Sequence, residues 1–285
     1  MTILEGKVAV ITGSTRGLGR AIAEAYAAAG ASVVVSSRTP SAVDETVQSL
    51  RAQGFTAGGL ACDVGHVEEV KALAEHAVTQ FGGFDIWVNN AGISGIYGPT
   101  MAHSPEQFVH VVQTNILGTY YGSFVAIQHF LTRGGGKLIN LVGAGERKPA
   151  PLQNAYGSSK AWVRNFTLAL AEEYEDSGIG VYAFQPGLVD TDLLRHIDVI
   201  PGHEKRLEVF PTIIRMWGNP PEVPARKAVW IASSATDGRT GLEVKANGMG
   251  HMLAGVLREG WRRLTGRAGE PIELDIRPVL PAQAR

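Results

Sequence analysis

Short apolar runs rich in β-branched residues alternate along the chain with longer segments whose apolar residues recur every three or four positions. The first pattern is typical of buried strands and the second of amphipathic helices. Together they predict strands at 7–12, 32–37, 56–63, 84–89, 137–142, 180–185 and 242–246. They predict helices at 20–29, 41–53, 67–81, 105–131, 155–176 and 221–233.

The order of these elements indicates the fold class. Strands that alternate with helices of about ten or more residues form right-handed βαβ crossovers, so we expect an α/β protein with a seven-stranded parallel sheet and helices on both faces. No linker divides the chain, which predicts one doubly wound domain over residues 1–248. We expect residues 190–220 to be an irregular insertion, and residues 249–285 to be a C-terminal extension rather than an independent domain.

Composition narrows the function classes. With 26 Lys and Arg against 27 Asp and Glu, the net charge of −1 argues against a nucleic-acid-binding protein. The single cysteine, Cys62, excludes an intrachain disulfide framework and suits a reducing compartment. No secretory signal, membrane-span-length apolar run or metal-ligand spacing is visible. We therefore expect a cytoplasmic protein without a membrane span or a metal.

A glycine-rich loop follows the first predicted strand and precedes the first helix. Its glycines, Gly13, Gly17 and Gly19, have the spacing Gly-x-x-x-Gly-x-Gly. A strand–turn–helix of this kind directs backbone N–H groups and a helix N-terminus at an anion, so it predicts a dinucleotide site. A tight turn with nothing bound is the alternative.

The end of the second predicted strand bears on the choice of cofactor. An acidic residue there bonds the ribose 2′-hydroxyl of NAD, whereas a basic residue accommodates the 2′-phosphate of NADP. The strand ends in Ser36 and Ser37 and is followed by Arg38, while Arg16 lies in the glycine loop. Two arginines that converge on one dianion favour NADP(H). The alternative is that both are solvated surface charges.

Tyr156 and Lys160 lie four residues apart on one predicted helix, so they share a face. A free tyrosine has a pKa of about 10 and is mostly protonated at neutral pH. A lysine ammonium one turn away, with the positive nicotinamide of an oxidised cofactor nearby, lowers that pKa. The pair therefore predicts an acid/base that gives a proton to a carbonyl oxygen or takes one from an alcohol.

Five motifs occur in order along residues 5–248. They are Thr12-Gly13-x-x-x-Gly17-x-Gly19, Cys62-Asp63-Val64, Asn89-Asn90-Ala91-Gly92, Tyr156-x-x-x-Lys160 and Pro186-Gly187-x-Val189-x-Thr191. In this combination the sequence strongly resembles the short-chain dehydrogenase/reductase family. The resemblance implies a Rossmann-type fold, oxidoreductase activity of the carbonyl reductase or alcohol dehydrogenase type, and a homodimer or homotetramer assembled through the helices near 105–131 and 155–176.

The same resemblance implies roles for particular residues. It places Tyr156, Lys160 and Asn115 in catalysis, with Asn115 at a proton-relay position through water. It implies cofactor contacts by Gly13, Ser14, Thr15, Arg16, Gly17, Leu18, Gly19, Ser37, Arg38, Asp63, Val64, Asn89, Ala91, Gly92, Tyr156, Lys160, Pro186, Gly187, Val189 and Thr191.

One position departs from the family pattern. The family usually has a serine thirteen residues before the tyrosine, where it bonds the substrate oxygen, but Gly143 stands there. Ser94, Gln153 or a held water is a candidate replacement, or the substrate is positioned by its own polar groups. The alternatives are an NADP(H)-binding protein with weak or no redox activity, and a non-redox isomerase or dehydratase of the same fold.

The apolar insertion at 190–220 is expected to cover the reacting end of the cofactor as a lid, with Ile93, Ile96 and Tyr97 as the opposite wall. Such a pocket suits a small apolar or aromatic ketone, or the matching secondary alcohol.

The extension contains an amphipathic pattern. Apolar residues fall on one helical face and arginines on the other: Met252, Leu253, Val256, Leu257, Trp261 and Leu264 against Arg258, Arg262 and Arg263. A helix of this kind lies on a membrane surface or packs against protein, and we favour packing against the same subunit or a neighbour. The proline-containing stretch after Gly266 is expected to be extended.

Overall fold

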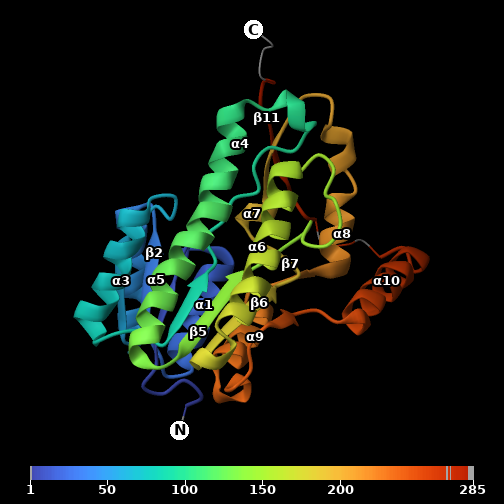
Figure 1. The fold of residues 1–285 in the computed structure, drawn as a ribbon. Coiled ribbons are helices and arrows are strands. Elements are labelled where there is room, and N and C mark those ends of the chain that lie inside the picture. The colour runs from blue at the N-terminus through green and yellow to red at the C-terminus, as the bar shows by residue number, and fades with distance from the viewer. Residues whose placement is uncertain (1, 268, 270, 282–285) are drawn as a thin grey trace.

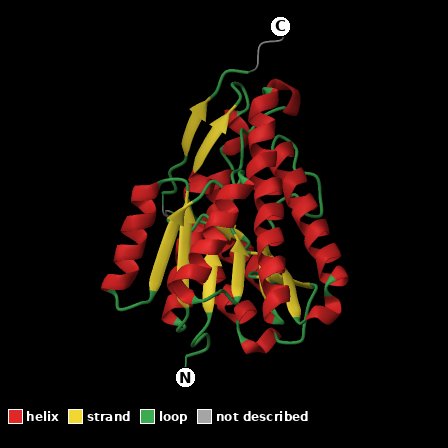
Figure 2. Ribbon diagram, turned by 60° about the vertical axis from the view of Figure 1, so that its left-hand side comes forward, coloured by secondary structure: helices red, strands yellow, loops and turns green. Residues whose placement is uncertain are grey.

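The computed structural model describes residues 2–267, 269 and 271–281, and a parallel sheet forms its middle layer (Figures 1 and 2). Seven strands pair in the order β10-β6-β5-β4-β1-β2-β3, all of them parallel. They are β1 (Val8–Ile11), β2 (Ser32–Ser37), β3 (Ala57–Ala61), β4 (Ile86–Asn89), β5 (Gly136–Leu141), β6 (Ile179–Gln185) and β10 (Leu242–Lys245). The predicted seven-stranded, doubly wound sheet is confirmed.

Helices cover both faces of this sheet. The principal ones are α1 (Gly17–Ala28), α2 (Pro40–Ala52), α3 (Val67–Phe81), α4 (Pro105–Val111), α5 (Gly118–Arg133), α6 (Asn154–Glu173) and α9 (Glu222–Ala232). Val33 and Val35 of β2 pack in one core with α1, α2 and α9, whereas Val34 packs in a second core with α3 and α5. Successive side chains of a strand point to opposite faces, which explains why buried strands read as continuous apolar runs.

The position of β1 fixes where a ligand binds. β1 pairs with both β2 and β4, so the strand order reverses between β1 and β4. In open α/β sheets ligands bind beyond the carboxyl ends of the strands at such a reversal.

The predicted helix over 105–131 is not continuous. Six residues of π-helix, η2 (Val112–Leu117), separate α4 from α5. The Asn115 carboxamide inside this turn bonds both backbone groups of Ile93 at 2.9 Å. This tie to the loop after β4 accounts for the wider turn, because π-turns form where a local contact displaces the regular ladder.

The segment 190–220 was predicted to be irregular, and that prediction is wrong. It contains α7 (Asp192–Arg195), β8 (His196–Val199), the short 3₁₀-helix η4 (Glu204–Leu207), α8 (Phe210–Trp217) and β9 (Gly218–Asn219). β9 pairs with β7 (Leu188–Val189), and β8 pairs with β11 (Asp275–Pro278) from the C-terminal segment. Further 3₁₀ turns are η1 (Thr100–Ala102), η3 (Glu175–Ser177) and η5 (Ser234–Thr236).

The C-terminal extension consists of α10 (Met249–Leu264) and β11, and α10 projects from the side of the molecule beyond α9 (Figure 1). Residues 268, 270 and 282–285 of the predicted extension lie outside the described residues. Among the described residues, no helix combines the length and apolar character that a membrane crossing requires.

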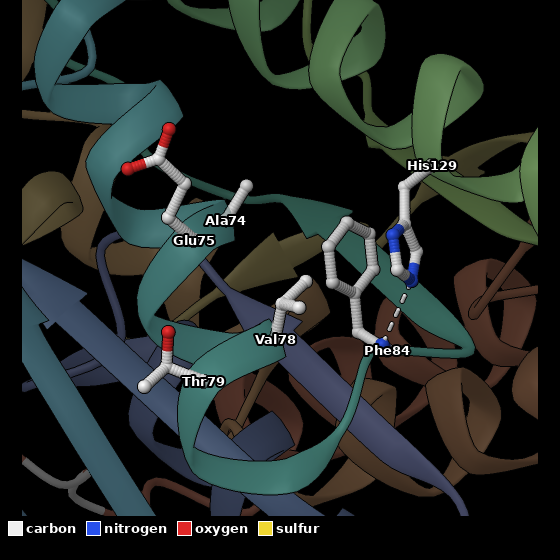
Figure 3. A pocket seen from close by; sticks show the side chains of 6 residues that line it. All are labelled: Ala74, Glu75, Val78, Thr79, Phe84 and His129. Carbon is white, nitrogen blue, oxygen red and sulfur yellow. Dashed lines mark hydrogen bonds between the residues drawn. The ribbon is translucent and has the colours of Figure 1, made fainter.

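A cavity of about 400 Å³ lies beside α3 and α5 (Figure 3). Phe84 and His129 line this cavity, and their stacked rings have centroids 4.0 Å apart. Nε2 of His129 accepts a hydrogen bond from the backbone N–H of Phe84 at 3.1 Å. This cavity has no residue in common with the cleft at the strand ends that is described next.

Candidate active site

A cleft of about 410 Å³ lies over the carboxyl ends of the central strands. It brings together most of the residues predicted from the sequence. These are Gly13, Thr15, Arg16, Gly17, Leu18, Gly19, Ser37, Arg38, Asp63, Val64, Ala91, Gly92, Tyr156, Lys160, Pro186, Gly187, Val189 and Thr191. Because β2 and β6 lie on opposite sides of β1 and β4, Arg38 and the lid residues mark the two ends of the cleft.

Three predicted residues do not line the cleft but support its walls. Ser14 Oγ donates to the carbonyl oxygen of Ile11 at 2.6 Å and accepts from the N–H of Ser36 at 3.0 Å, which ties β1 to β2. The buried Asn89 carboxamide bonds Asn140 of the neighbouring strand at 2.8 Å.

The third, Asn115, is fully buried, and its carboxamide makes three hydrogen bonds. Besides its two bonds to Ile93, it donates to Ser159 Oγ at 3.0 Å. Ser159 lies one residue before Lys160, so Asn115 links the loop after β4 to α6. A Cβ on Gly92 would be 3.3 Å from Asn115 Oδ1 and 3.7 Å from Lys160 Nζ. The amide oxygen and the ammonium group therefore both lie close to the space that a side chain at position 92 would occupy.

The glycine loop fits a dinucleotide. Gly13 and Gly17 adopt positive φ of 62° and 54°, which favours glycine. A Cβ on Gly13 would lie 2.9 Å from Ala91 Cα, so a side chain at position 13 would collide with the loop that follows β4. The Asn90 carboxamide holds the loop by donating to the carbonyl oxygens of Thr12 and Gly13 at 2.9 and 3.0 Å. No side chain caps α1, which leaves its first N–H groups for an anion.

The two arginines predicted to meet a phosphate both line the cleft. Arg38 is exposed, and it forms no ion pair among the described residues. Arg16 is also exposed, with Nη1 3.5 Å from Asp192 Oδ2 on the lid. Sequence reasoning missed Asp192, because nothing along the chain shows that the start of α7 faces the glycine loop.

Tyr156 and Lys160 face the cleft from α6, and Nζ of Lys160 is 5.7 Å from the centroid of the tyrosine ring. Nζ donates to the carbonyl oxygen of Leu141 at 3.0 Å. Burial lowers the pKa of Lys160 to about 8, and burial, followed by the charge of Glu146, raises the pKa of Tyr156 to about 12. In the protein alone, desolvation outweighs the lysine, and Tyr156 is protonated at neutral pH.

Glu146 is a titratable neighbour that sequence reasoning did not single out. Its side chain is only 10% exposed, and Oε1 is 3.7 Å from Nε of Arg147. Oε2 is buried without a hydrogen-bond partner among the described residues. Burial raises the pKa of this carboxyl.

Gly143 faces Tyr156 across the cleft floor. A Cβ there would overlap the Tyr156 hydroxyl and lie 3.3 Å from Cζ of the ring. The hydroxyl therefore occupies the space that a serine side chain would use. Two of the predicted replacements, Ser94 and Gln153, line the same cleft, and the Gln153 side chain does not cap α6 although it stands at the N-cap position.

The lid end of the cleft is apolar. Leu193, Leu194 and Phe210 line it, and Ile93 contributes from the opposite wall as predicted. The ring of Tyr97 packs edge-on against that of Phe210, with the two ring centroids 6.4 Å apart. Within the part of the chain that the structure describes, no group of three His, Cys, Asp or Glu residues is placed to hold a metal.

Comparison with known proteins agrees with this fold. Residues 7–199 match the short chain dehydrogenase family. The chain is 37% identical to 3beta-hydroxysteroid dehydrogenase 1 of Eggerthella lenta and 32% identical to glucose 1-dehydrogenase 2 of Bacillus subtilis. Each match spans 247 residues, which is 86% of this chain and 94% or 95% of the relative.

Among solved structures, a 3-ketoacyl-(acyl-carrier-protein) reductase from Brucella melitensis, complexed with NADH, superposes with a TM-score of 0.75 at 31% identity. The match covers 86% of this chain and 98% of that one. The protein belongs to the short-chain dehydrogenase/reductase family, and it is an oxidoreductase of a family that uses a nicotinamide cofactor.

Proposed function

We propose that the protein is an NADP(H)-dependent carbonyl reductase, and in reverse an alcohol dehydrogenase, for small apolar or aromatic substrates. The observation that carries the proposal is the Tyr156 hydroxyl over Gly143, beside Lys160, in a cleft with the exposed Arg38 at one end and apolar side chains at the other. We further propose a single domain over residues 1–248 with 249–285 as its extension, a cytoplasmic location, and a homodimer or homotetramer.

The cofactor is held by backbone N–H groups of the glycine loop at its pyrophosphate, by Arg38 and Arg16 at the 2′-phosphate, and by Lys160 and the turn Pro186–Thr191 at the nicotinamide end. When bound, the nicotinamide supplies or accepts the hydride. Ser37 at the end of β2 brings no carboxylate that would repel a 2′-phosphate.

Tyr156 does the proton chemistry. Because its pKa is about 12, the neutral phenol is present at neutral pH and donates its proton to the substrate carbonyl oxygen. The Lys160 ammonium stabilises the phenolate that remains. Gln153 and Ser94 take the place of the family serine in holding the substrate oxygen.

The substrate class follows from the lid. Leu193, Leu194 and Phe210 offer apolar contacts and no charge that would bind a phosphorylated sugar. The relative from Eggerthella lenta is named for a hydroxysteroid, an apolar secondary alcohol, which agrees with this reading.

The proposal is tested by NADPH and NADH consumption against a panel of apolar, aromatic and polar ketones. We expect turnover with NADPH and apolar ketones, and a loss of about 100-fold or more in kcat for Tyr156→Phe, because the proton donor is removed. Gln153→Leu is expected to raise KM for the ketone without changing NADPH binding. Turnover that is unaffected by Tyr156→Phe contradicts the mechanism.

The glycine at position 143 supports a second candidate, an NADP(H)-binding protein with weak or no redox activity. A missing oxyanion donor costs about 100-fold or more in kcat in related settings. Tight NADPH binding without consumption for any ketone would favour this alternative. Product formation without a net change in NADPH would favour an isomerase or dehydratase.

A further inference from the structure

The helix α10 turns its apolar face to solvent. Its large apolar side chains are 48% to 85% exposed: Met252, Leu253, Val256, Leu257, Trp261 and Leu264. In a globular protein the apolar stripe of a surface helix faces the core, so this orientation is the reverse of the usual one. Among the described residues this face packs against no part of its own subunit, so of the predicted packing against the same subunit or a neighbour, the neighbour stays a prediction.

The opposite face of α10 is held against the body of the protein. Gly255 lies so close to Met216 of α8 that a Cβ would overlap its carbonyl oxygen. Nε1 of Trp217 donates to the carbonyl oxygen of Met252 at 3.1 Å. Glu259 is 7% exposed, on the packed side of the helix. The contacts with α8 fix the rotation of α10, so the apolar face points outward because of packing.

Positive charge lies along one border of the outward face and behind it. Residues 249–267 contain four arginines and one glutamate, which leaves a charge of +3 with neutral histidine. Arg263, whose side chain is 65% exposed, and Arg262, which is 27% exposed, pair with the buried Glu259 at 3.0 and 2.6 Å. Nη2 of Arg258 donates to the carbonyl oxygen of Met216 on α8 at 3.2 Å. Arg258 and Arg267 form no ion pair among the described residues.

The exposed apolar face of α10 and the positive charge of its arginines together favour a negatively charged binding surface. A second copy that paired through the same helix would bring two charges of +3 together, whereas an anionic surface would neutralise them. A helix with Leu and Trp on one face, arginines at the borders and a polar face behind is typical of helices that lie in a membrane interface.

We propose that α10 docks on an anionic lipid surface, with Leu253, Leu257 and Leu264 at the boundary of headgroups and acyl chains and the exposed Arg263 and Arg267 against the headgroups. The docking is peripheral. It also leaves α8, which carries the cleft residue Phe210, on the far side of α10, one helix layer away from the bilayer. For an apolar substrate this shortens the path from the bilayer to the cleft, a consequence that rests on the proposed function while the docking itself does not.

Co-sedimentation of the full chain with vesicles tests the proposal. We expect binding to phosphatidylcholine vesicles that contain phosphatidylglycerol, weak binding to phosphatidylcholine alone, and release as salt is raised. Leu253→Glu with Leu257→Glu is expected to weaken binding at least tenfold. Arg263→Gln with Arg267→Gln is expected to weaken binding to the vesicles that contain phosphatidylglycerol and to leave binding to pure phosphatidylcholine unchanged.

Matched controls separate the helix from surface character in general. Ile3→Glu changes another apolar side chain, 67% exposed, and Lys71→Gln with Arg226→Gln removes two positive charges elsewhere. Both are expected to bind vesicles like the parent protein. Unchanged circular dichroism and NADPH affinity of the α10 variants would show that lost vesicle binding is not unfolding.

Two results would overturn the proposal. The first is a parent protein that does not co-sediment with anionic vesicles at low salt, or binds neutral vesicles equally well. The second is a lower particle mass in solution for Leu253→Glu with Leu257→Glu, without vesicle binding by the parent. That result assigns the face to a second copy of the chain.

Discussion

The hydroxyl of Tyr156 lies directly over Gly143, in the space that a Cβ on residue 143 would occupy. The same Cβ would lie 3.4 Å from Cγ of Lys160, so the side chains of Tyr156 and Lys160 both pack against this glycine. The absence of a side chain at position 143 therefore leaves room for the hydroxyl of Tyr156, the proposed proton donor.

Filling this space is expected to move the hydroxyl. Gly143→Ala should lower kcat for carbonyl reduction about tenfold, because a displacement of about 1 Å in a catalytic group costs up to about 100-fold. Gly143→Ser should recover part of that loss, since its hydroxyl adds a donor for the substrate oxygen. Steady-state kinetics with NADPH would check both, with the NADPH dissociation constant unchanged as control. A Gly143→Ala variant as fast as the parent would contradict this account.

Periodicity was sufficient to predict the sheet, whereas the residues at its carboxyl edge were predicted from motif spacings and the family resemblance. Apolar runs such as 32–37 are buried on both sides by helices, so they appear as unbroken β-branched stretches. The glycine loop and the pair Tyr156 and Lys160 were visible because the chemistry depends on short spacings along the chain. Those spacings do not change when the chain folds.

The features missed depend on contacts between distant segments. The π-turn at Asn115 forms because its side chain bonds Ile93, twenty-two positions earlier in the sequence. The strands β8 and β11 are four residues each, too short to show a period, and each exists because the other pairs with it. Ser14 belongs to the glycine-loop motif, but its hydroxyl accepts a hydrogen bond from the backbone N–H of Ser36 in β2 and does not line the cleft.

Arg38 is expected to set the preference for NADPH over NADH. It is exposed at the cleft and has no acidic partner within the described part of the chain, so Arg38→Ala removes a charge that could meet a 2′-phosphate. We expect the NADPH dissociation constant to rise at least tenfold and that for NADH to change less than twofold. Fluorescence titration of both cofactors would measure this. Equal weakening for the two would show that Arg38 contacts something other than the phosphate.

Glu146 is expected to shift the pH profile. Its charge is one cause of the raised pKa of Tyr156, so Glu146→Gln should lower that pKa. Alcohol oxidation needs the phenolate and rises with pH through that pKa, so its profile should move to lower pH. The high-pH decline of carbonyl reduction should move the same way. Profiles of kcat/KM against pH would test this, with the exposed Glu68→Gln as control; a shift to higher pH would refute it.

His129 links stability to pH. Its Nε2 accepts the Phe84 N–H, which requires an unprotonated nitrogen (Figure 3). Burial, followed by the charge of Arg133, lowers the pKa of His129 in the folded protein. Because the folded pKa is below the unfolded value of about 6.5, the stabilisation is complete above the unfolded pKa and is lost as pH falls through the folded one.

We therefore expect the free energy of unfolding to decrease as pH is lowered from about 8 to about 5, and His129→Gln to remove part of that decrease. The glutamine oxygen accepts the Phe84 N–H and does not titrate in this range, so the variant should resemble the parent at pH 8 and exceed it at pH 5. Urea unfolding at several pH values would measure the difference, with the exposed His110→Gln as control. The same pH dependence in both variants would show that the His129 contact does not contribute, and would leave the buried His103, whose pKa is also lowered by burial, as the next group to change.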